Sequence, residues 1–360
     1  MKQLITLLLI LAVTAVAAQE TKTKGSFLGS IESNSQVYLK DSKRNIEVPD
    51  DPFRSNTYLQ LQYNYKKWTV GVQGEAYLPK ALLNLNPKHK GVGVGTAFVN
   101  YKSTKLDITA GHFYEQFGSG LLLRSWEDRF LGINNAILGG RIKYSPVSHV
   151  RFIAVAGKQR SGFDISNGIV FGMDAEIDIL SVSEKQQSDL SLGISYVGRN
   201  EDFKTPLTNP TFKETTNGLS GRLNYSKKGF TASAEYVHKS KDGILYDKAH
   251  VDTTFVKPGS ALLLNMGYAK KGTGFNITLR RIENMSFYSE REPEILEGNE
   301  SSIYFNDKMI NYIPSLTKQH HFNLANIYVY QAQQLVSLDP STNIGKAGDV
   351  GGMIDFFSQF

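Results

Sequence analysis

Residues 68–78 read WTVGVQGEAYL, and this stretch decides the fold. The even positions carry Trp, Val, Val, Gly, Ala and Leu, whereas the odd positions carry Thr, Gly, Gln, Glu and Tyr. Successive side chains of a β-strand point to opposite faces, so this period of two predicts a strand with one apolar and one polar face. The same division recurs at 168–180, 188–198 and 217–226. The chain is therefore predicted to be built from amphipathic strands.

Two architectures produce such strands: a soluble sandwich or barrel with its apolar face inward, and a membrane barrel with that face outward. Three features favour the membrane barrel. The apolar stripes run about ten residues, as a tilted membrane-spanning strand requires. Many stripes end in an aromatic residue of the kind that forms interfacial girdles, namely Tyr77, Tyr101, Phe113, Tyr144, Tyr196, Tyr225 and Tyr268. Short connections alternate with long polar ones. Outer-membrane barrels show the same alternation, with short turns on the periplasmic side and long loops on the external side.

We therefore predict an all-β chain that forms a transmembrane antiparallel up-and-down β-barrel of about 14–16 strands. The expected strands are 26–38, 56–65, 67–78, 91–101, 104–113, 136–144, 149–157, 168–180, 188–198, 217–226, 229–239, 259–270, 273–283, 316–330 and 347–357. These are fifteen, whereas single-chain bacterial barrels have an even number of strands. If the first strand leaves the periplasm and each later strand reverses direction, 347–357 ascends away from the periplasm. We therefore expect either that 26–38 is not a full barrel strand or that the sequence is C-terminally incomplete.

The N-terminus predicts export. Met1 and Lys2 begin it, an apolar run covers 4–17, and the small residues 15–18 precede Gln19. This is the layout of a secretory signal peptide, so we expect a signal peptide at 1–18 and a single barrel at 19–360. The expected location is the outer membrane, with the lipid bilayer, lipopolysaccharide and the outer-membrane assembly machinery as partners; a homo-oligomer is left open.

The net charge of +6 gives no reason to expect nucleic acid as a partner. The basic residues are not gathered in a patch interleaved with aromatic residues, and many of them sit in short turns. No Gly-x-Ser-x-Gly motif accompanies a serine nucleophile. Cysteine is absent, which removes thiolate chemistry and cysteine-based zinc sites. We therefore expect no enzyme activity, no cofactor and no bound metal.

The segment YEQFGSGLLLRSWEDRFLGINN, residues 114–135, is the most unusual stretch. It gathers charged side chains around a Gly-Ser-Gly sequence: Glu115, Arg124, Glu127, Asp128 and Arg129. If this long loop folds into the lumen, those charges would line a constriction and screen solutes. A loop that is ion-paired and only stiffens the barrel is the equal alternative.

A second group of charges comprises Asp174, Glu176 and Asp178, which share one face of one strand. Such a ladder could favour cations in a pore or bind calcium. Unpaired carboxylates in a row would repel one another. We therefore favour pairing with inward bases such as Arg151, Arg222 or Arg280.

Four stretches resemble a family of porin-like outer-membrane proteins of Gram-negative bacteria that is classed as of unknown function. They are the 114–135 segment, EAYLPKALL at 75–83, LDITAGHFYEQFGSGLLLR at 106–124 and FIAVAGKQRSGF at 152–163. The resemblance extends from about Gly25 to about Ile179 and then weakens. It implies an outer-membrane barrel and supplies no substrate or catalytic residue.

The function expected from these features is passive diffusion of small polar solutes through a porin-like barrel. A plugged barrel with a structural or secretion-associated role is the alternative. The two differ in whether the lumen is open, which the sequence leaves undecided.

Overall fold

The structure is a computed structural model of the 360-residue chain. It describes residues 25–48, 50–82, 88–129, 132–180, 188–202, 213–243, 256–292, 294–296, 299–304, 308–313 and 349–358. The expected signal peptide at 1–18 and the expected strand 316–330 lie outside these residues. No helix in the described part of the chain is long and apolar enough to cross a membrane.

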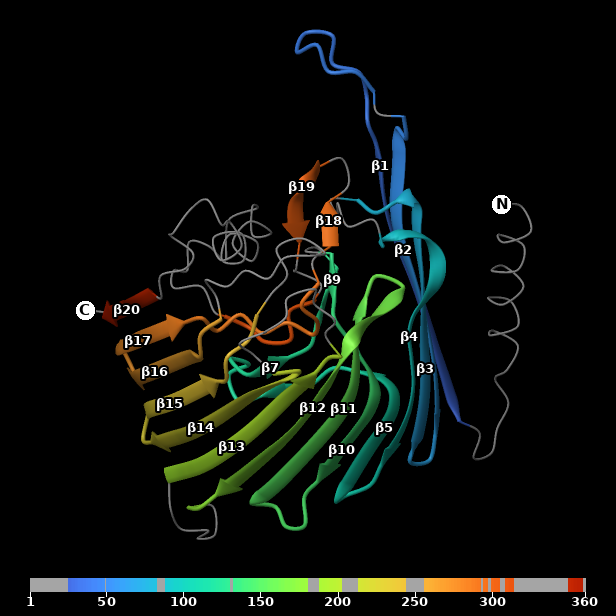
Figure 1. Cartoon of the computed structure of the whole chain (residues 1–360). Helices are drawn as coiled ribbons and strands as arrows, with labels where there is room; N and C mark the ends of the chain where they lie inside the picture. Colours follow the sequence, from blue (N-terminus) through green and yellow to red (C-terminus); the bar gives the residue numbers. More distant parts are fainter. Residues whose placement is uncertain are drawn as a thin grey trace.

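One antiparallel sheet of fourteen strands dominates the fold (Figure 1). Its strands, in order across the sheet, are β1 (Ser26–Val37), β2 (Phe53–Tyr65), β3 (Trp68–Lys80), β4 (Lys90–Lys102), β5 (Leu106–Phe113), β10 (Ile137–Tyr144), β11 (Val150–Ser161), β12 (Asp164–Asp178), β13 (Ser188–Asn200), β14 (Thr215–Lys227), β15 (Phe230–Lys239), β16 (Gly259–Lys270), β17 (Thr273–Glu283) and β20 (Asp349–Ser358). Each corresponds to one of the predicted strands. The predicted antiparallel up-and-down, all-β architecture is confirmed, with fourteen strands in the range expected.

Six short strands lie within the connections and pair with one another. They are β6 (Gln116–Phe117) with β7 (Leu123–Arg124), β8 (Glu127–Asp128) with β9 (Ile133–Asn134), and β18 (Glu294–Leu296) with β19 (Asn299–Tyr304). None of the six joins the main sheet. The long connections therefore have local structure of their own.

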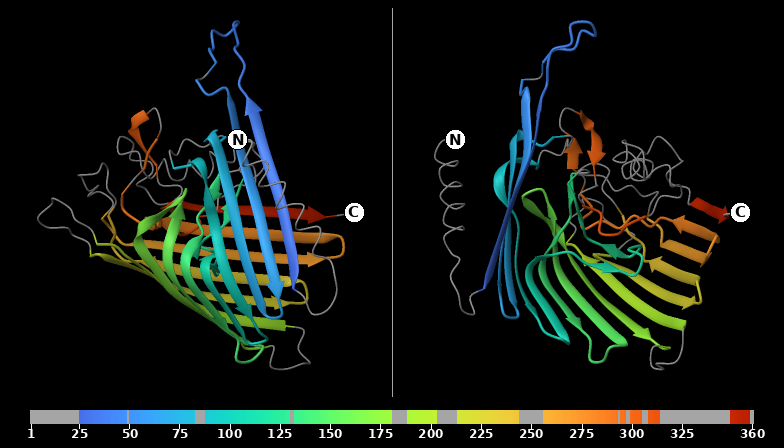
Figure 2. Two further views of the ribbon diagram at one scale, coloured as in Figure 1. Left: turned by 90° about the vertical axis from the view of Figure 1, so that its right-hand side faces the viewer. Right: turned by 180° about the vertical axis from the view of Figure 1, so that it is seen from behind.

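The sheet curls around an interior, and we call it the barrel wall (Figure 2). β1 and β20 are its two edges, and no pairing joins them within the described residues. The expectation that the last strand ascends is wrong. Ile277 of β17 lies opposite Ile354 of β20, so β20 pairs directly with β17 and runs antiparallel to it. The prediction from the sequence placed an additional strand, 316–330, between β17 and β20. That additional strand reversed the expected direction of β20.

The burial pattern of the wall is the reverse of that of a soluble sheet. Along β12 the outward residue Met173 is 67% exposed, whereas its neighbour Asp174 is 3% exposed. Along β3 the outward Val70 and Val72 are exposed, and the inward Gln73 is buried. Water would favour the opposite arrangement, because burying charge and exposing apolar surface are both costly. The apolar face of the wall thus points away from the interior, as a membrane barrel requires.

Aromatic side chains form a belt on the outward face near the short turns. Trp68 lies 5.0 Å from Tyr101 between ring centroids, and Tyr268 lies 6.0 Å from Phe275. Tyr144 is also exposed there, and Tyr225 packs on Phe230 with centroids 6.4 Å apart. We call these residues, together with Tyr65, the aromatic belt.

Two residues expected in such a girdle are instead inside, namely Tyr77 and Phe113. Tyr77 shares the inward row of β3 with Gln73 and Glu75, and its hydroxyl donates a hydrogen bond to Glu75. Phe113 lies opposite Ile137, which is itself buried in the interior core. Both rings point inward because other buried side chains pack against them there: Phe113 belongs to the main interior cluster, and Tyr77 packs with Tyr58 and Ala81.

The short and the long connections lie on opposite rims, as predicted. The turns at 66–67, 103–105, 145–149, 228–229 and 271–272 lie on one rim, and the described parts of the connections after β1, β5 and β17 begin on the other. One connection departs from the prediction, because β11 and β12 continue to a tight turn at Gly162 and Phe163. Gly162 has a φ of +61°, a conformation that glycine adopts without strain.

Candidate functional site

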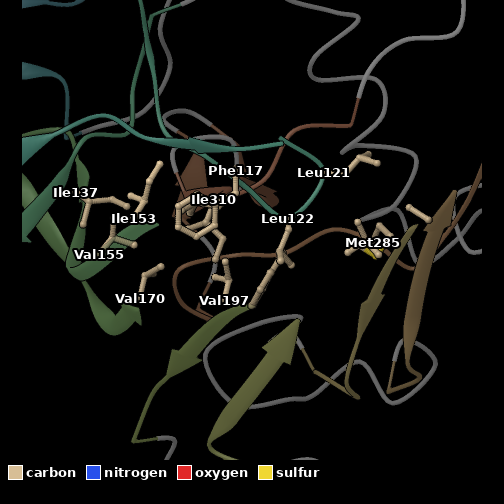
Figure 3. Packing of buried hydrophobic residues seen from close by; sticks show 14 of the residues in the cluster. Phe117, Leu121, Leu122, Ile137, Ile153, Val155, Val170, Val197, Met285 and Ile310 are labelled. Atoms are coloured by element: carbon tan, nitrogen blue, oxygen red, sulfur yellow. The ribbon is translucent and has the colours of Figure 1, made fainter. Parts of the chain in front are cut away.

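The 114–135 loop turns into the interior of the barrel wall and forms an apolar core there (Figure 3). Phe117, Leu122 and Leu123 are fully buried. They pack in one cluster with inward residues near the ends of the wall strands, including Val170 and Val197. The loop therefore fills part of the lumen, as the constriction hypothesis requires, but it does so first with apolar side chains.

A second segment, from the connection after β17, joins the loop inside the barrel. The backbone N–H of Arg124 donates to the carbonyl of Ile310 at 2.7 Å, and that of Tyr312 donates to the carbonyl of Gly120 at 2.9 Å. The Asn311 side-chain amide donates to the carbonyls of Leu121 and Met285. We call residues 114–129, 285–292 and 308–313 together the inner plug.

The five charged residues predicted to line one constriction lie at different places. Arg124 contacts two rings that lie edge to face, with its guanidinium carbon 4.4 Å from the centroid of Trp126 and 4.2 Å from that of Tyr312. Glu115 is buried and forms an ion pair with Lys143 of β10 at 2.6 Å. Arg124 therefore links two segments of the inner plug, and Glu115 links the plug to the barrel wall.

Glu127, Asp128 and Arg129 lie on the opposite side, against β1–β3. Arg129 forms ion pairs with Glu32 of β1 at 2.5 Å and with Glu127 at 3.2 Å. Its guanidinium lies 4.4 Å from the ring centroid of Tyr58. Asp128 pairs through its backbone with Ile133 in the β8–β9 ladder. The burial is partial, so these groups remain within reach of the lumen water.

The carboxylate ladder lies on the inward face of β12, and the predicted ion pairs are present for two of its members. Arg222 of β14 contacts Asp174 at 2.6 Å and Glu176 at 3.1 Å. Glu176 also pairs with Arg151 of β11 at 3.2 Å. Asp178 donates its backbone N–H to the carbonyl of His149 at 2.8 Å. The alternating charges of neighbouring strands neutralise one another across the wall.

A polar cavity of about 310 Å³ separates the tip of the plug from this part of the wall. Its charged lining comprises Arg151, Glu176, Arg222 and Glu235. Glu235 also fixes the plug, because its carboxylate accepts the backbone N–H of Ser119 at 2.8 Å. The cavity thus presents both signs of charge to whatever enters it.

A buried ion cluster, which the sequence did not suggest, anchors the other half of the plug. Arg291 contacts Asp242 at 3.0 Å and Glu201 at 3.3 Å, and Arg199 contacts Asp242 at 2.6 Å. Both arginines are fully buried. Arg291 also donates to the carbonyl of Lys213 at 2.9 Å. Four separate segments meet here, so no local spacing in the sequence could have revealed the cluster.

The pKa values of the two carboxyl groups in the cluster are shifted in opposite directions. Burial would raise the pKa of Asp242, but the guanidinium groups of Arg199 and Arg291 lower this pKa to about 2. Burial raises the pKa of Glu201 above its ordinary value despite the same two arginines. Asp242 is therefore the anion that holds the two guanidinium groups together.

The sequence did not predict a second buried ion pair either. Arg160 of β11 donates to Glu75 of β3 at 2.9 Å, and Glu75 accepts a further hydrogen bond from Gln73 at 2.9 Å. Arg160 belongs to the GKQRSG sequence at 157–162, which has no phosphate-loop spacing. Alternation would place Arg160 in the outward row of β11 with Phe152, and only the register shift between Lys158 and Arg160 brings it inside. In the described residues, no group of three or more His, Asp or Glu side chains could hold a metal ion.

A family model matches residues 1–360. The chain belongs to the family of unknown function DUF6029. No curated protein matches this DUF6029 chain. The resemblance to an uncharacterised porin-like family agrees with this membership.

Several solved structures of outer-membrane proteins are similar to the DUF6029 chain at low identity. OprB of Pseudomonas putida is 12% identical with a TM-score of 0.40, over 72% of this chain and 76% of that one. The outer membrane channel DcaP of Acinetobacter baumannii is 11% identical with a TM-score of 0.35, over 74% and 80%. OpdK of Pseudomonas aeruginosa, solved with vanillate, is 9% identical with a TM-score of 0.36, over 72% and 82%. The fold assignment rests on the strand pairing and not on these likenesses.

Proposed function

We propose that this chain is a porin-like protein of the outer membrane that lets small polar solutes diffuse passively through its lumen. The observation that carries the proposal is the reversed burial of the wall, with apolar side chains outward and charged ones inward. An interior lined by Gln73, Asp174 and Arg222 suits polar solutes, and the outward face suits lipid. The lipid bilayer and lipopolysaccharide would be its surroundings, with the assembly machinery inserting it.

The proposed route passes the cavity beneath the plug, where Arg151 and Glu176 are the most accessible charges. Their side chains are 51% and 29% exposed, against 4% for Arg222. Fixed charges beside a narrow aqueous path alter the local concentration of ions of each sign. The charges of the 114–135 loop would contribute by holding the plug in place, since Glu115, Arg124 and Arg129 each contact other side chains.

Conductance of the purified protein in planar bilayers tests the proposal. Arg151→Gln removes one positive charge from the route and should move the reversal potential in a salt gradient toward cation selectivity. Arg281→Gln is the matched control, because Arg281 is similarly exposed, at 52%, but lies in the outward row of β17. An equal shift in both variants would contradict the proposed route.

A plugged barrel with a structural or secretion-associated role is the second candidate. The complete burial of Phe117, Leu122 and Phe287 within the lumen favours it, because an apolar core excludes water. Protein that inserts into the bilayer but never gives channel events would exclude passive diffusion and favour this candidate. Neither candidate involves catalysis.

A further inference from the structure

The rim with the short turns carries a dense row of lysines. Eight lysines occupy four of its connections and the strand ends beside them: Lys66, Lys67, Lys102, Lys105, Lys227, Lys228, Lys270 and Lys271. All eight are exposed. The residues 66–67, 102–105, 227–229 and 270–272 include no Asp or Glu. The opposite rim differs, since at the tip of the β1–β2 hairpin Lys40 pairs with Glu47 and Arg44 with Asp41.

The lysines lie directly beside the aromatic belt. Lys66 and Lys67 connect Tyr65 to Trp68, and the ammonium group of Lys66 lies 5.2 Å from the centroid of the Tyr65 ring. Lys227 and Lys228 lie between Tyr225 and Phe230 in the same way. Figure 2 shows these turns along one edge of the wall. Each turn therefore repeats one unit, in which exposed lysines are placed just beyond outward aromatic rings.

This unit matches the chemistry of a lipid headgroup layer. Aromatic rings of membrane barrels sit at the boundary between acyl chains and headgroups. Lysines just beyond that boundary reach the phosphate groups while their methylene stems stay on apolar surface. Each lysine near an anionic membrane surface strengthens binding about fivefold. An acidic protein would satisfy the lysines but would leave the adjacent rings without a reason to face outward.

We propose that the short-turn rim binds anionic phospholipid headgroups of the leaflet that it faces. The lysines of each turn would engage a phosphate, and the aromatic belt would contact the first part of the acyl chains. The inference rests on the proposed membrane location but not on conduction. It assigns a specific lipid class to one rim of the barrel.

Trp68 provides a local probe of this contact, because it follows Lys67 and belongs to the belt. The full-length chain carrying Trp126→Phe, in which Trp68 is the one remaining tryptophan, is inserted into phosphatidylcholine vesicles. Brominated phosphatidylglycerol or brominated phosphatidylcholine is then added at equal fraction, and quenching of Trp68 is compared. We expect phosphatidylglycerol to be preferred by fivefold or more, and the preference to weaken in high salt.

The test variant combines Lys66→Asn with Lys67→Gln. Lys66 has a φ of +55°, a conformation that asparagine tolerates, so the turn is kept. The preference should fall at least fivefold. The matched control, Lys270→Gln with Lys271→Gln, removes the same charge from a distant turn and should leave the quenching of Trp68 unchanged.

Three outcomes would contradict the inference. Equal quenching by the two lipids in the parent protein would overturn lipid selectivity alone. An unchanged preference in the Lys66→Asn, Lys67→Gln variant would overturn the role of the lysines and leave an acidic protein as the partner to test. Absence of quenching by either lipid would overturn the membrane location as well, and so it is distinguishable from the other two.

Discussion

Arginine placed on the outward face of β13 tests the orientation of the whole wall. Ile194 lies at the midpoint of β13, opposite Gly221 of β14, and is 62% exposed. At the centre of a bilayer, Ile194→Arg should lower the free energy of unfolding by about 2–4 kcal/mol. In water the same change would lose only the part of the isoleucine that is buried, about 1 kcal/mol.

Two neighbouring positions in β14 provide the comparison. Leu223 is 41% exposed on the outward face, nearer the aromatic belt, and Asn224 is exposed toward the cavity. Leu223→Arg should cost less than Ile194→Arg, because the cost falls to about 0–1 kcal/mol near the interface. Asn224→Arg should be nearly neutral, since Glu176 and Glu235 line the same cavity.

The assay is unfolding by guanidinium from phospholipid vesicles, followed by the fluorescence of Trp68 and Trp126. If the wall lies in a membrane, the loss of unfolding free energy will depend on the depth and the face of the substituted residue. It will not follow the exposure of that residue in water. Equal costs for the three arginines, or a cost at Ile194 of no more than about 1 kcal/mol, would refute the outward assignment.

Two further predictions concern the inner plug. Phe117→Ala should lower the stability of the folded protein by about 3–5 kcal/mol in the same unfolding assay, because Phe117 is fully buried and its loss leaves a cavity; a change below 1 kcal/mol would mean that the plug is not packed as described. Asp242 has a pKa lowered to about 2 from 3.8, so its stabilising effect is present above about pH 4 and is lost as the pH falls toward 2. The difference in unfolding free energy between the parent and Asp242→Asn should therefore shrink by about 2 kcal/mol over that range, and a constant difference would contradict the ion cluster.

The wall strands could be predicted because their signal is local. A period of two along WTVGVQGEAYL depends only on neighbouring residues, and it identified both the strand and the two faces. The direction of the last strand could not be derived in the same way. It depended on whether 316–330 separates β17 from β20 in the sheet, and that is a question of pairing between distant segments.

The candidate site was predictable only in part. The ion pairs of Asp174 and Glu176 with Arg222 could be anticipated, because inward charges on strands close together in the sheet can meet, here across Gly193 of the intervening β13. The contact of Arg124 with the Tyr312 ring could not, because Tyr312 comes from a connection almost 190 residues later. The charged residues of this one loop therefore lie in three different environments.

The sequence by itself determined which residues form the wall, which face of each strand is apolar, and which rim carries the short turns. These follow from alternation and turn composition, which are properties of a few consecutive residues. The tertiary structure alone decided that the connections after β5 and β17 enter the lumen, that Phe117 and Phe287 share one core, and that Arg199, Asp242 and Arg291 meet. The physical reason is that burial of apolar side chains and of ion pairs depends on which distant segments supply the partner, and no period along the chain encodes that choice.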